Sequence, residues 1–342
     1  MSRSNSTGRT VIITGAAAGV GRAIANRFAR AGDRLGLIAR DAVALEAVRK
    51  EVEAQGAEAA FEAVDVADAA GLFAAAERLE QKLGKIDIWI NDAMLTVFSP
   101  VAEITPEEFR RVTEVTYLGF VHGTMAALKS MRPRRTGRII QVGSALAYRG
   151  IPLQSAYCGA KHAIRGFTDS LRTELMHEKA GILVSLVELP AVNTPQFDWA
   201  RAHISHSPRP MGRPIEPEVV ADAIFRVARG RFREYWLGAP TVLTIVGDAV
   251  LPGLLDRYLA RNAVEGQQTP RPIAYGRRDN LDKPLTDLHR TRGSFSAESG
   301  SWAPLVVGEL ARVGVVAAIA LTGFALGAGL SLGRARPARR WF

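Results

Sequence analysis

The feature that most constrains the fold of this chain is the alternation of short apolar runs with longer helical patterns over about its first 240 residues. The runs are typical of buried strands, and the stretches between them carry apolar residues at helical spacing. Strands are expected at 11–14, 34–40, 57–66, 86–92, 137–144, 182–190 and 233–238, and the clearest helices at 43–55, 67–83, 106–130 and 156–177. This alternation predicts an α/β fold, a doubly wound parallel sheet with helices on both faces.

A glycine-rich turn joins the first expected strand to the first helix. The stretch TGAAAGVG (14–21) places Gly15, Gly19 and Gly21 directly after the strand and before an apolar helical pattern. Glycine lets the backbone turn sharply and approach a pyrophosphate, whose charge is favoured by the free N–H groups of a helix N-terminus. The turn therefore indicates a nucleotide site, with a purely structural turn as the alternative from this motif alone.

A serine, a tyrosine and a lysine follow at spacings that suit proton transfer. Tyr157 and Lys161 are four residues apart and share one face of an expected helix, so the lysine cation is expected to lower the pKa of the phenol. A phenol with a lowered pKa is a usable general acid or base. Ser144, at the end of an expected strand, is expected to hydrogen-bond the substrate oxygen. Cys158, the single cysteine, is expected to be a small packed residue.

Together these motifs resemble the short-chain dehydrogenase/reductase family over about residues 9–240. TGAAAGVG matches the family's TGxxxGxG pattern, and Ser144, Tyr157 and Lys161 match its catalytic serine, tyrosine and lysine in both spacings. The dipeptide DV (65–66) resembles its adenine-contacting position, and PAVNT (190–194) resembles its PGxxxT segment.

The resemblance implies a Rossmann-like fold that transfers hydride between a nicotinamide cofactor and a carbonyl or alcohol. It also implies a small-molecule substrate and a homo-oligomer, either a dimer or a tetramer. The residues that it assigns to the cofactor are Thr14, Gly15, Ala18, Gly19, Val20, Gly21, Asp65, Val66, Asn91, Ala93, Tyr157, Lys161, Pro190 and Thr194.

Two positions depart from the family pattern. The family's NNAG reads Asn91-Asp92-Ala93-Met94, so methionine replaces the glycine that lets the backbone approach the cofactor. The family's helix asparagine, which shapes a water relay to the lysine, falls at Thr116, which is expected to serve with a shorter reach. These departures support an alternative function, a dinucleotide-binding sensor or scaffold with weak turnover. A lyase or epimerase that uses the same tyrosine is a weaker alternative.

The choice of cofactor depends on the end of the second expected strand. NAD enzymes carry an acid there for the ribose 2′-OH, whereas NADP enzymes tend to offer arginine. Ala39 occupies the expected acidic place and Arg40 follows, so Arg40 is expected to pair with a 2′-phosphate. Asp41 leaves NAD(H) open, because it offers a ribose ligand in a shifted register. NADP(H) is favoured.

The segment 195–214 follows the last cofactor motif and is expected to form an irregular lid, because it is rich in proline. Its mixture of Phe197, Trp199 and Met211 with polar residues suits a large lipophilic carbonyl or alcohol. His203 and His206 are expected to be surface or lid histidines, because no acidic or cysteine partner follows them, and no metal site is expected.

The resemblance ends near residue 240, where three further parts are expected. Residues 241–262 predict a pair of accessory helices broken near Pro252, and the polar stretch 263–304 predicts a flexible linker. Within the remaining part, 305–342, residues 313–332 carry no charge and are long enough to cross a bilayer, with a helix docked in an apolar groove as the alternative.

The net charge and the number of cysteines limit which partners and which cellular compartment are expected. The net charge of +10 does not indicate nucleic-acid binding, because the arginines are scattered and no known binding motif appears. The single cysteine fits a reducing compartment, and the nicotinamide requirement places the catalytic domain, residues 1–240, in the cytoplasm. Attachment to a membrane through 313–332 is the accompanying expectation.

Overall fold

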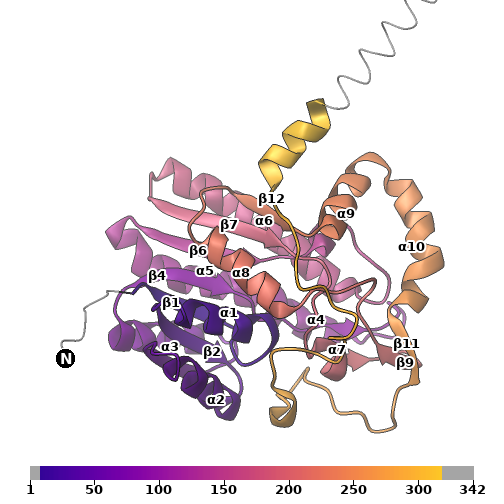
Figure 1. Cartoon of the computed structure of the whole chain (residues 1–342), viewed down its shortest axis with the longest axis horizontal. Helices are drawn as coiled ribbons and strands as arrows, with labels where there is room; N and C mark the ends of the chain where they lie inside the picture. Colours follow the sequence, from indigo (N-terminus) through magenta and orange to yellow (C-terminus); the bar gives the residue numbers. More distant parts are fainter. Residues whose placement is uncertain (1–7, 318–342) are drawn as a thin grey trace, which may run out of the picture.

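A sheet of eight strands forms the centre of the computed structural model, which describes residues 8–317 (Figure 1). The strand order is β12-β10-β7-β6-β4-β1-β2-β3, and all neighbours run parallel except β10 and β12. The predicted α/β fold with a doubly wound, mostly parallel sheet is therefore confirmed. The strands are β1 (Thr10–Thr14), β2 (Arg34–Ala39), β3 (Ala59–Ala63), β4 (Ile86–Asn91), β6 (Gly137–Val142), β7 (Ile182–Glu188), β10 (Glu234–Leu237) and β12 (Leu305–Val307).

Helices cover both faces of this sheet, in two separate apolar clusters. One face carries α1 (Gly19–Ala29), α2 (Ala42–Glu53) and α8 (Pro217–Val227). The other face carries α3 (Ala69–Leu83), α5 (Gly119–Met131) and α6 (Ser155–His177). The helix α4 (Pro106–Thr113) begins with a Thr105–Glu108 capping box and runs into a π-helical turn, Glu114–Leu118, before α5.

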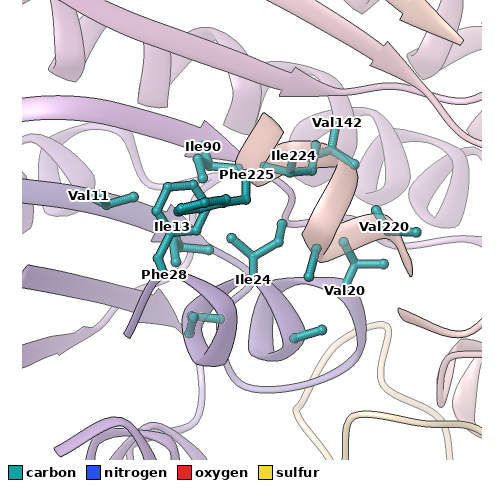
Figure 2. Close-up of a cluster of buried hydrophobic side chains, with 14 of the residues drawn as sticks. Val11, Ile13, Val20, Ile24, Phe28, Ile90, Val142, Val220, Ile224 and Phe225 are labelled. Atoms are coloured by element: carbon teal, nitrogen blue, oxygen red, sulfur yellow. The ribbon is translucent and has the colours of Figure 1, made fainter. Parts of the chain in front are cut away.

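The cluster under α1 and α8 shows why the three central residues of the first strand are all apolar. Val11 and Ile13 face this cluster, while Ile12 belongs to the cluster on the opposite face. Phe28 of α1 and Phe225 of α8 meet edge to face over the strand, with ring centres 5.1 Å apart (Figure 2). Because a parallel strand is buried on both faces, an uninterrupted apolar run such as VII is what its position requires.

The order of the strands reverses at β1, which predicts a ligand site beyond the carboxyl ends of the central strands. β1 pairs with β2 on one side and with β4 on the other. In such sheets ligands bind outside the carboxyl ends of the strands at this reversal. The loops that leave β1, β4, β6 and β7 at this edge contain Gly15, Asp92, Ser144 and Pro190.

Beyond β10 the chain forms two helices and a small sheet. The helices α9 (Ala239–Val250) and α10 (Pro252–Gly266) meet at Leu251, next to the expected break. The expected lid is only partly irregular, because it contains α7 (Gln196–Trp199), β8 (Arg201–Ala202) and β9 (His206–Pro208). β8 pairs with β5 (Val97–Phe98), and β9 pairs with β11 (Gln268–Pro272).

The stretch 263–304 is packed against the core, so the expectation of a flexible linker is corrected. Figure 1 shows it running from β11 along the lower edge of the view and back to β12, which adds an antiparallel strand to β10. Leu281 is 1% exposed within the cluster under α3 and α5. The linker prediction failed because it relied on the polar average composition of the segment. The segment is held in place by the buried side chain of Leu281 and by backbone hydrogen bonds, which an average does not reveal.

The described residues, 8–317, contain no helix with the length and apolar character needed to cross a bilayer. Residues 308–317 are helical. Most of the stretch 313–332, on which the expected membrane helix rests, lies outside the described residues.

Replacing Leu281 tests whether this C-terminal stretch is docked. Leu281→Ala is expected to lower the free energy of unfolding by about 2–5 kcal/mol, because it removes a fully buried leucine side chain. Chemical denaturation measures the change, with Leu254→Ala as the control, since Leu254 is exposed. Equal stability of the two variants would mean that 263–304 is a linker after all.

Candidate active site

A large cavity of about 690 Å³ opens at the carboxyl ends of β1, β4, β6 and β7. This volume is typical of sites for small molecules and cofactors. The residues predicted from the sequence that line it are Gly15, Ala18, Gly19, Val20, Arg40, Asp65, Val66, Ala93, Ser144, Tyr157, Lys161, Pro190 and Thr194. The structure therefore brings most of the predicted site together.

The glycines of the first turn are required by close backbone contacts. Gly15 has a φ of +73°, and a Cβ there would lie 2.9 Å from the backbone of Ala93. A Cβ on Gly21 would lie 2.3 Å from the carbonyl oxygen of Gly15. Gly19, with a φ of +54°, begins α1 and faces the cavity. The turn thus aims at the cavity a helix N-terminus whose first residue has no side chain, which fits the pyrophosphate of a dinucleotide.

Three predicted residues, Thr14, Gly21 and Asn91, do not line the cavity but hold in place the strands and the turn that form it. Gly21 packs against Gly15 as described. The Thr14 hydroxyl accepts hydrogen bonds from the amides of Asp92 and Ala93 at 3.1 and 3.3 Å. The Asn91 amide donates to Gln141 at 2.8 Å and accepts from the Trp89 indole at 2.7 Å. These bonds fix the carboxyl ends of β1, β4 and β6 relative to one another.

Thr116 is also fully buried and does not line the cavity, so its expected place in the proton path stays a prediction. Its hydroxyl donates to the carbonyl of Leu95 and accepts from the amide of Leu95, both at 2.9 Å. It lies in the π-helical turn between α4 and α5. With both hydrogen-bonding directions used, the side chain holds the loop after β4.

Ser144, Tyr157 and Lys161 meet on the cavity wall. Ser144 lies two residues beyond the end of β6, and its hydroxyl accepts from the amide of Leu146 at 3.2 Å. Its side chain also hydrogen-bonds Tyr157. The Lys161 ammonium donates to the carbonyl of Val142 at 2.7 Å and lies 5.5 Å from the centre of the Tyr157 ring. The expected constellation is therefore present in space.

The electrostatics of this trio differ from the expectation. Burial raises the pKa of Tyr157 above its ordinary value, and only the hydrogen bond from Ser144 opposes that rise. On balance the pKa of the phenol is therefore raised by burial, and not lowered as the spacing to Lys161 alone predicts. Burial also lowers the pKa of Lys161, because the charged ammonium loses its hydration.

Two buried carboxyl groups partly restore the charge of Lys161. Asp92 and Glu188 both raise its pKa, because their anions favour the ammonium. Burial raises the pKa of Asp92 in turn, against the lowering by Lys161 and by the Gly21 amide. Burial and the nearby Glu234 raise the pKa of Glu188 to about 8.

Sequence reasoning did not assign a role to either carboxyl group, although signals existed. Asp92 replaces an asparagine of the family pattern, and Glu188 interrupts the apolar run ILVSLVELP.

Arg40 lies at the cavity but is not free. Its guanidinium donates to the carbonyls of Leu281 and Asp282 at 3.1 and 3.2 Å, and also to that of Asn280. Asp41 is the N-cap of α2 and accepts from two amides at 2.9 and 3.1 Å. Arg40, expected at the 2′-phosphate, is therefore engaged by the chain itself, whereas the Oδ2 of Asp41 has no hydrogen-bond partner among the described residues.

Asp65 lines the cavity and caps the turn at the amide of Ala67, 3.0 Å away, while pairing with Arg111.

The opposite end of the cavity is apolar, and the lid histidines stand outside it. His203 lies 3.0 Å from the carboxylate of Glu108, and His206 is bonded to Ser205 at 2.9 Å. The apolar lining of this end comes from the lid, α9 and α10, namely Met211, Leu243, Leu255, Tyr258 and Leu259. Phe197 and Trp199 of the lid also line the cavity, and the Trp199 ring packs against the His289 ring, 5.4 Å away.

Comparisons with known proteins agree with this arrangement. The family model for short chain dehydrogenases matches residues 9–204. The uncharacterized oxidoreductase YxnA of Bacillus subtilis is 31% identical over 268 residues, covering 77% of this chain and 75% of that protein. The 3-dehydrosphinganine reductase of Danio rerio is 32% identical over 195 residues, 56% of this chain and 58% of that protein.

A solved structure shows the same similarity in three dimensions. The alcohol dehydrogenase of Thermococcus sibiricus, complexed with 5-hydroxy-NADP, is 26% identical with a TM-score of 0.58, covering 67% of this chain and 95% of that one. With the family model matching more than half of the chain, this protein belongs to the short-chain dehydrogenase/reductase family and is an NAD(P)-dependent oxidoreductase.

Proposed function

We propose that this protein transfers hydride between NADPH and a lipophilic carbonyl or alcohol, with Tyr157 as the general acid and base. The observation that carries the proposal is one continuous cavity that holds the glycine turn, the Ser144–Tyr157–Lys161 trio and an apolar end. A catalytic group and a binding surface in one cavity is the arrangement that bimolecular chemistry requires.

The chain's own residues hold the cofactor and manage the proton. The N-terminus of α1 and the Gly15–Gly19 turn hold the pyrophosphate, and Thr194 and Lys161 hold the nicotinamide end. When bound, the cofactor supplies the hydride-transfer chemistry. The Tyr157 hydroxyl gives its proton to the developing alkoxide, and the Lys161 ammonium stabilises the tyrosinate that results. Ser144 orients the substrate oxygen next to the phenol.

The edge of β2 supports NADPH over NADH. Ala39 offers no carboxylate, and that of Asp41 is buried in the cap of α2. A ribose 2′-OH therefore lacks an acidic partner at the usual position, residue 39, and Asp41 offers it a single oxygen, the buried Oδ2. Arg40 meets only neutral carbonyl oxygens among its hydrogen-bond partners, and a phosphate dianion is a stronger acceptor than these. The NADP-type ligand of the Thermococcus sibiricus relative supports the same choice.

The apolar end of the cavity supports a lipophilic substrate. Leu243, Leu255, Tyr258 and Leu259 come from the α9–α10 pair, and Met211 faces them from the lid. Burying an alkyl chain against such side chains stabilises binding in proportion to the apolar area removed from water. The relative named 3-dehydrosphinganine reductase supports a substrate of this class.

Membrane attachment through residues 313–332 is the remaining part of the proposal, and it rests on the sequence. The full chain is expected to pellet with membranes and to resist extraction by high salt, because burial of an apolar helix is insensitive to ionic screening. A chain truncated after Ala317 keeps β12 and the Arg312–Glu234 ion pair and is expected to be released. Release of the full chain by salt would indicate attachment through the terminal arginines instead.

Removing the Tyr157 hydroxyl tests the mechanism. Tyr157→Phe is expected to lower kcat at least about a hundredfold, because general acid catalysis is lost, while NADPH binding is unchanged. Turnover of a panel of lipophilic aldehydes and ketones is followed at the nicotinamide absorbance. Tyr275→Phe, at an exposed tyrosine, is the control. Wild-type turnover in Tyr157→Phe would refute the assigned role.

Removing the anion at Asp92 tests the electrostatics of Lys161. The Asp92 carboxylate raises the pKa of Lys161, so Asp92→Asn lowers that pKa and the ammonium is lost at lower pH. The alkaline limb of kcat/KM against pH is expected to move down by about one unit. The exposed Asp222→Asn should leave the profile in place. An unmoved or rising alkaline limb in Asp92→Asn would contradict this coupling.

A further inference from the structure

The C-terminal stretch 279–293, which we term the strap, returns to the cavity from outside the region that the family model matches. Its residues on the cavity wall are Asn280, Pro284, Leu285 and His289. They face the ends of β2 and β3 and the start of α1, which is the adenosine side of the proposed dinucleotide site. The strap therefore borders the proposed cofactor from the side opposite the sheet.

One half of the strap is fastened around Arg40. The carbonyl of Leu281 accepts from Arg40 at 3.1 Å and from Arg111 at 3.4 Å, and Arg111 also pairs with Asp65. Arg201 holds the start of the strap through the carboxylates of Asp279 and Asp282, at 3.0 and 2.6 Å. These contacts join the strap to the ends of β2 and β3, to α4 and to β8.

The other half lies across the N-terminus of α1. The amide of Gly19 donates to the carbonyl of Arg290 at 3.0 Å, and Arg22 donates to the carbonyl of His289 at 3.0 Å. The Arg290 side chain pairs with Asp198 at 2.6 Å. The strap thus contacts the same helix end that is proposed to hold the pyrophosphate.

His289 is the residue of the strap that points to a ligand. It lines the cavity, and neither ring nitrogen has a hydrogen-bond partner among the described residues; Nε2 lies 3.4 Å from the Asp41 carboxylate without forming one. A buried polar group without a partner is costly, and a polar ligand in the cavity would supply one. A dinucleotide offers ribose hydroxyls and phosphate oxygens.

The strap is held mainly by contacts that can break while the core stays folded. Leu281 is the only buried residue among 279–293, and the remaining attachments include hydrogen bonds, partly exposed ion pairs and the contact of the His289 ring with Trp199. Segments with few buried apolar contacts open at a lower free energy than the core that they cover. The strap can therefore open without unfolding the sheet.

We infer that the strap is part of the dinucleotide site: it covers the adenosine half of the bound cofactor, and its opening controls the rate at which the cofactor leaves. This inference rests on the proposed function. Arg40 is the link, since it holds three strap carbonyls and faces the proposed position of the 2′-phosphate. The C-terminal extension then serves cofactor retention directly.

Gly293 offers a way to loosen the strap from its C-terminal end. Because its neighbour Thr194 lines the cavity, the Arg290→Ala variant below, which leaves Thr194 in place, decides whether a change in NADPH release comes from the strap. A Cβ there would lie 2.4 Å from the carbonyl oxygen of Thr194, a backbone atom that cannot easily move. Gly293→Ala is expected to increase hydrogen exchange across 279–293 and to raise the NADPH dissociation rate about tenfold, measured by stopped-flow fluorescence. Gly253→Ala is the matched control, because a Cβ at Gly253 meets open space.

A second variant is used alongside it, and alone if circular dichroism shows that Gly293→Ala does not fold. Arg290→Ala removes the ion pair with Asp198 and is expected to raise the dissociation rate about threefold, as the loss of a partly exposed pair implies. Arg132→Ala, which breaks a similarly exposed pair with Glu178 away from the cavity, should have no effect.

The outcomes separate the strap from the proposed function. Faster NADPH release in the strap variants, with unchanged controls, supports the inference. Increased hydrogen exchange in the strap with an NADPH dissociation rate within about twofold of wild type overturns it and leaves the function standing. A wild-type protein that binds neither NADPH nor NADH refutes the proposed function, and the strap's role with it.

Discussion

The close approach of two backbone turns, at Gly15 and Ala93, is the constraint on which the rest of the site depends. No side chain fits between them, since a Cβ on Gly15 would lie 2.9 Å from Ala93. That contact sets the distance between the carboxyl ends of β1 and β4, and Thr14 reinforces it through the amides of Asp92 and Ala93. The cavity, the start of α1 and the position of Asp92 all follow from this spacing.

Lys161 works within an environment that opposes its charge. Burial disfavours the ammonium, whereas Asp92, Glu188 and the carbonyl of Val142 favour it. The balance differs from that expected of an exposed tyrosine–lysine pair on a helix, in which the cation alone would lower the pKa of the phenol. Here the protonation of Lys161 depends on the charges of Asp92 and Glu188, so these three groups titrate as one coupled set.

The sequence was sufficient to predict features that repeat along the chain or that depend on the spacing of nearby residues. The alternation of strands and helices, the glycine turn and the positions of Ser144, Tyr157 and Lys161 are local patterns, and the structure places them as predicted. The roles of Arg40 and Thr116 depend on partners far away or on a π-helical turn, which no local pattern specifies. The polar composition of 263–304 concealed Leu281, because a few buried residues scarcely alter an average.

The antiparallel strand β12 has a consequence for how the protein behaves beside other copies of itself. It lies along β10 and occupies that margin of the sheet with three residue pairs, from Tyr235–Val307 to Leu237–Leu305. An uncovered strand margin is a template for pairing with foreign strands and for aggregation. The short β12, followed at once by a helix, ends the sheet on this side, so growth of a continuous sheet between copies is blocked at β10 and the N–H and C=O groups of β10 are satisfied within the chain.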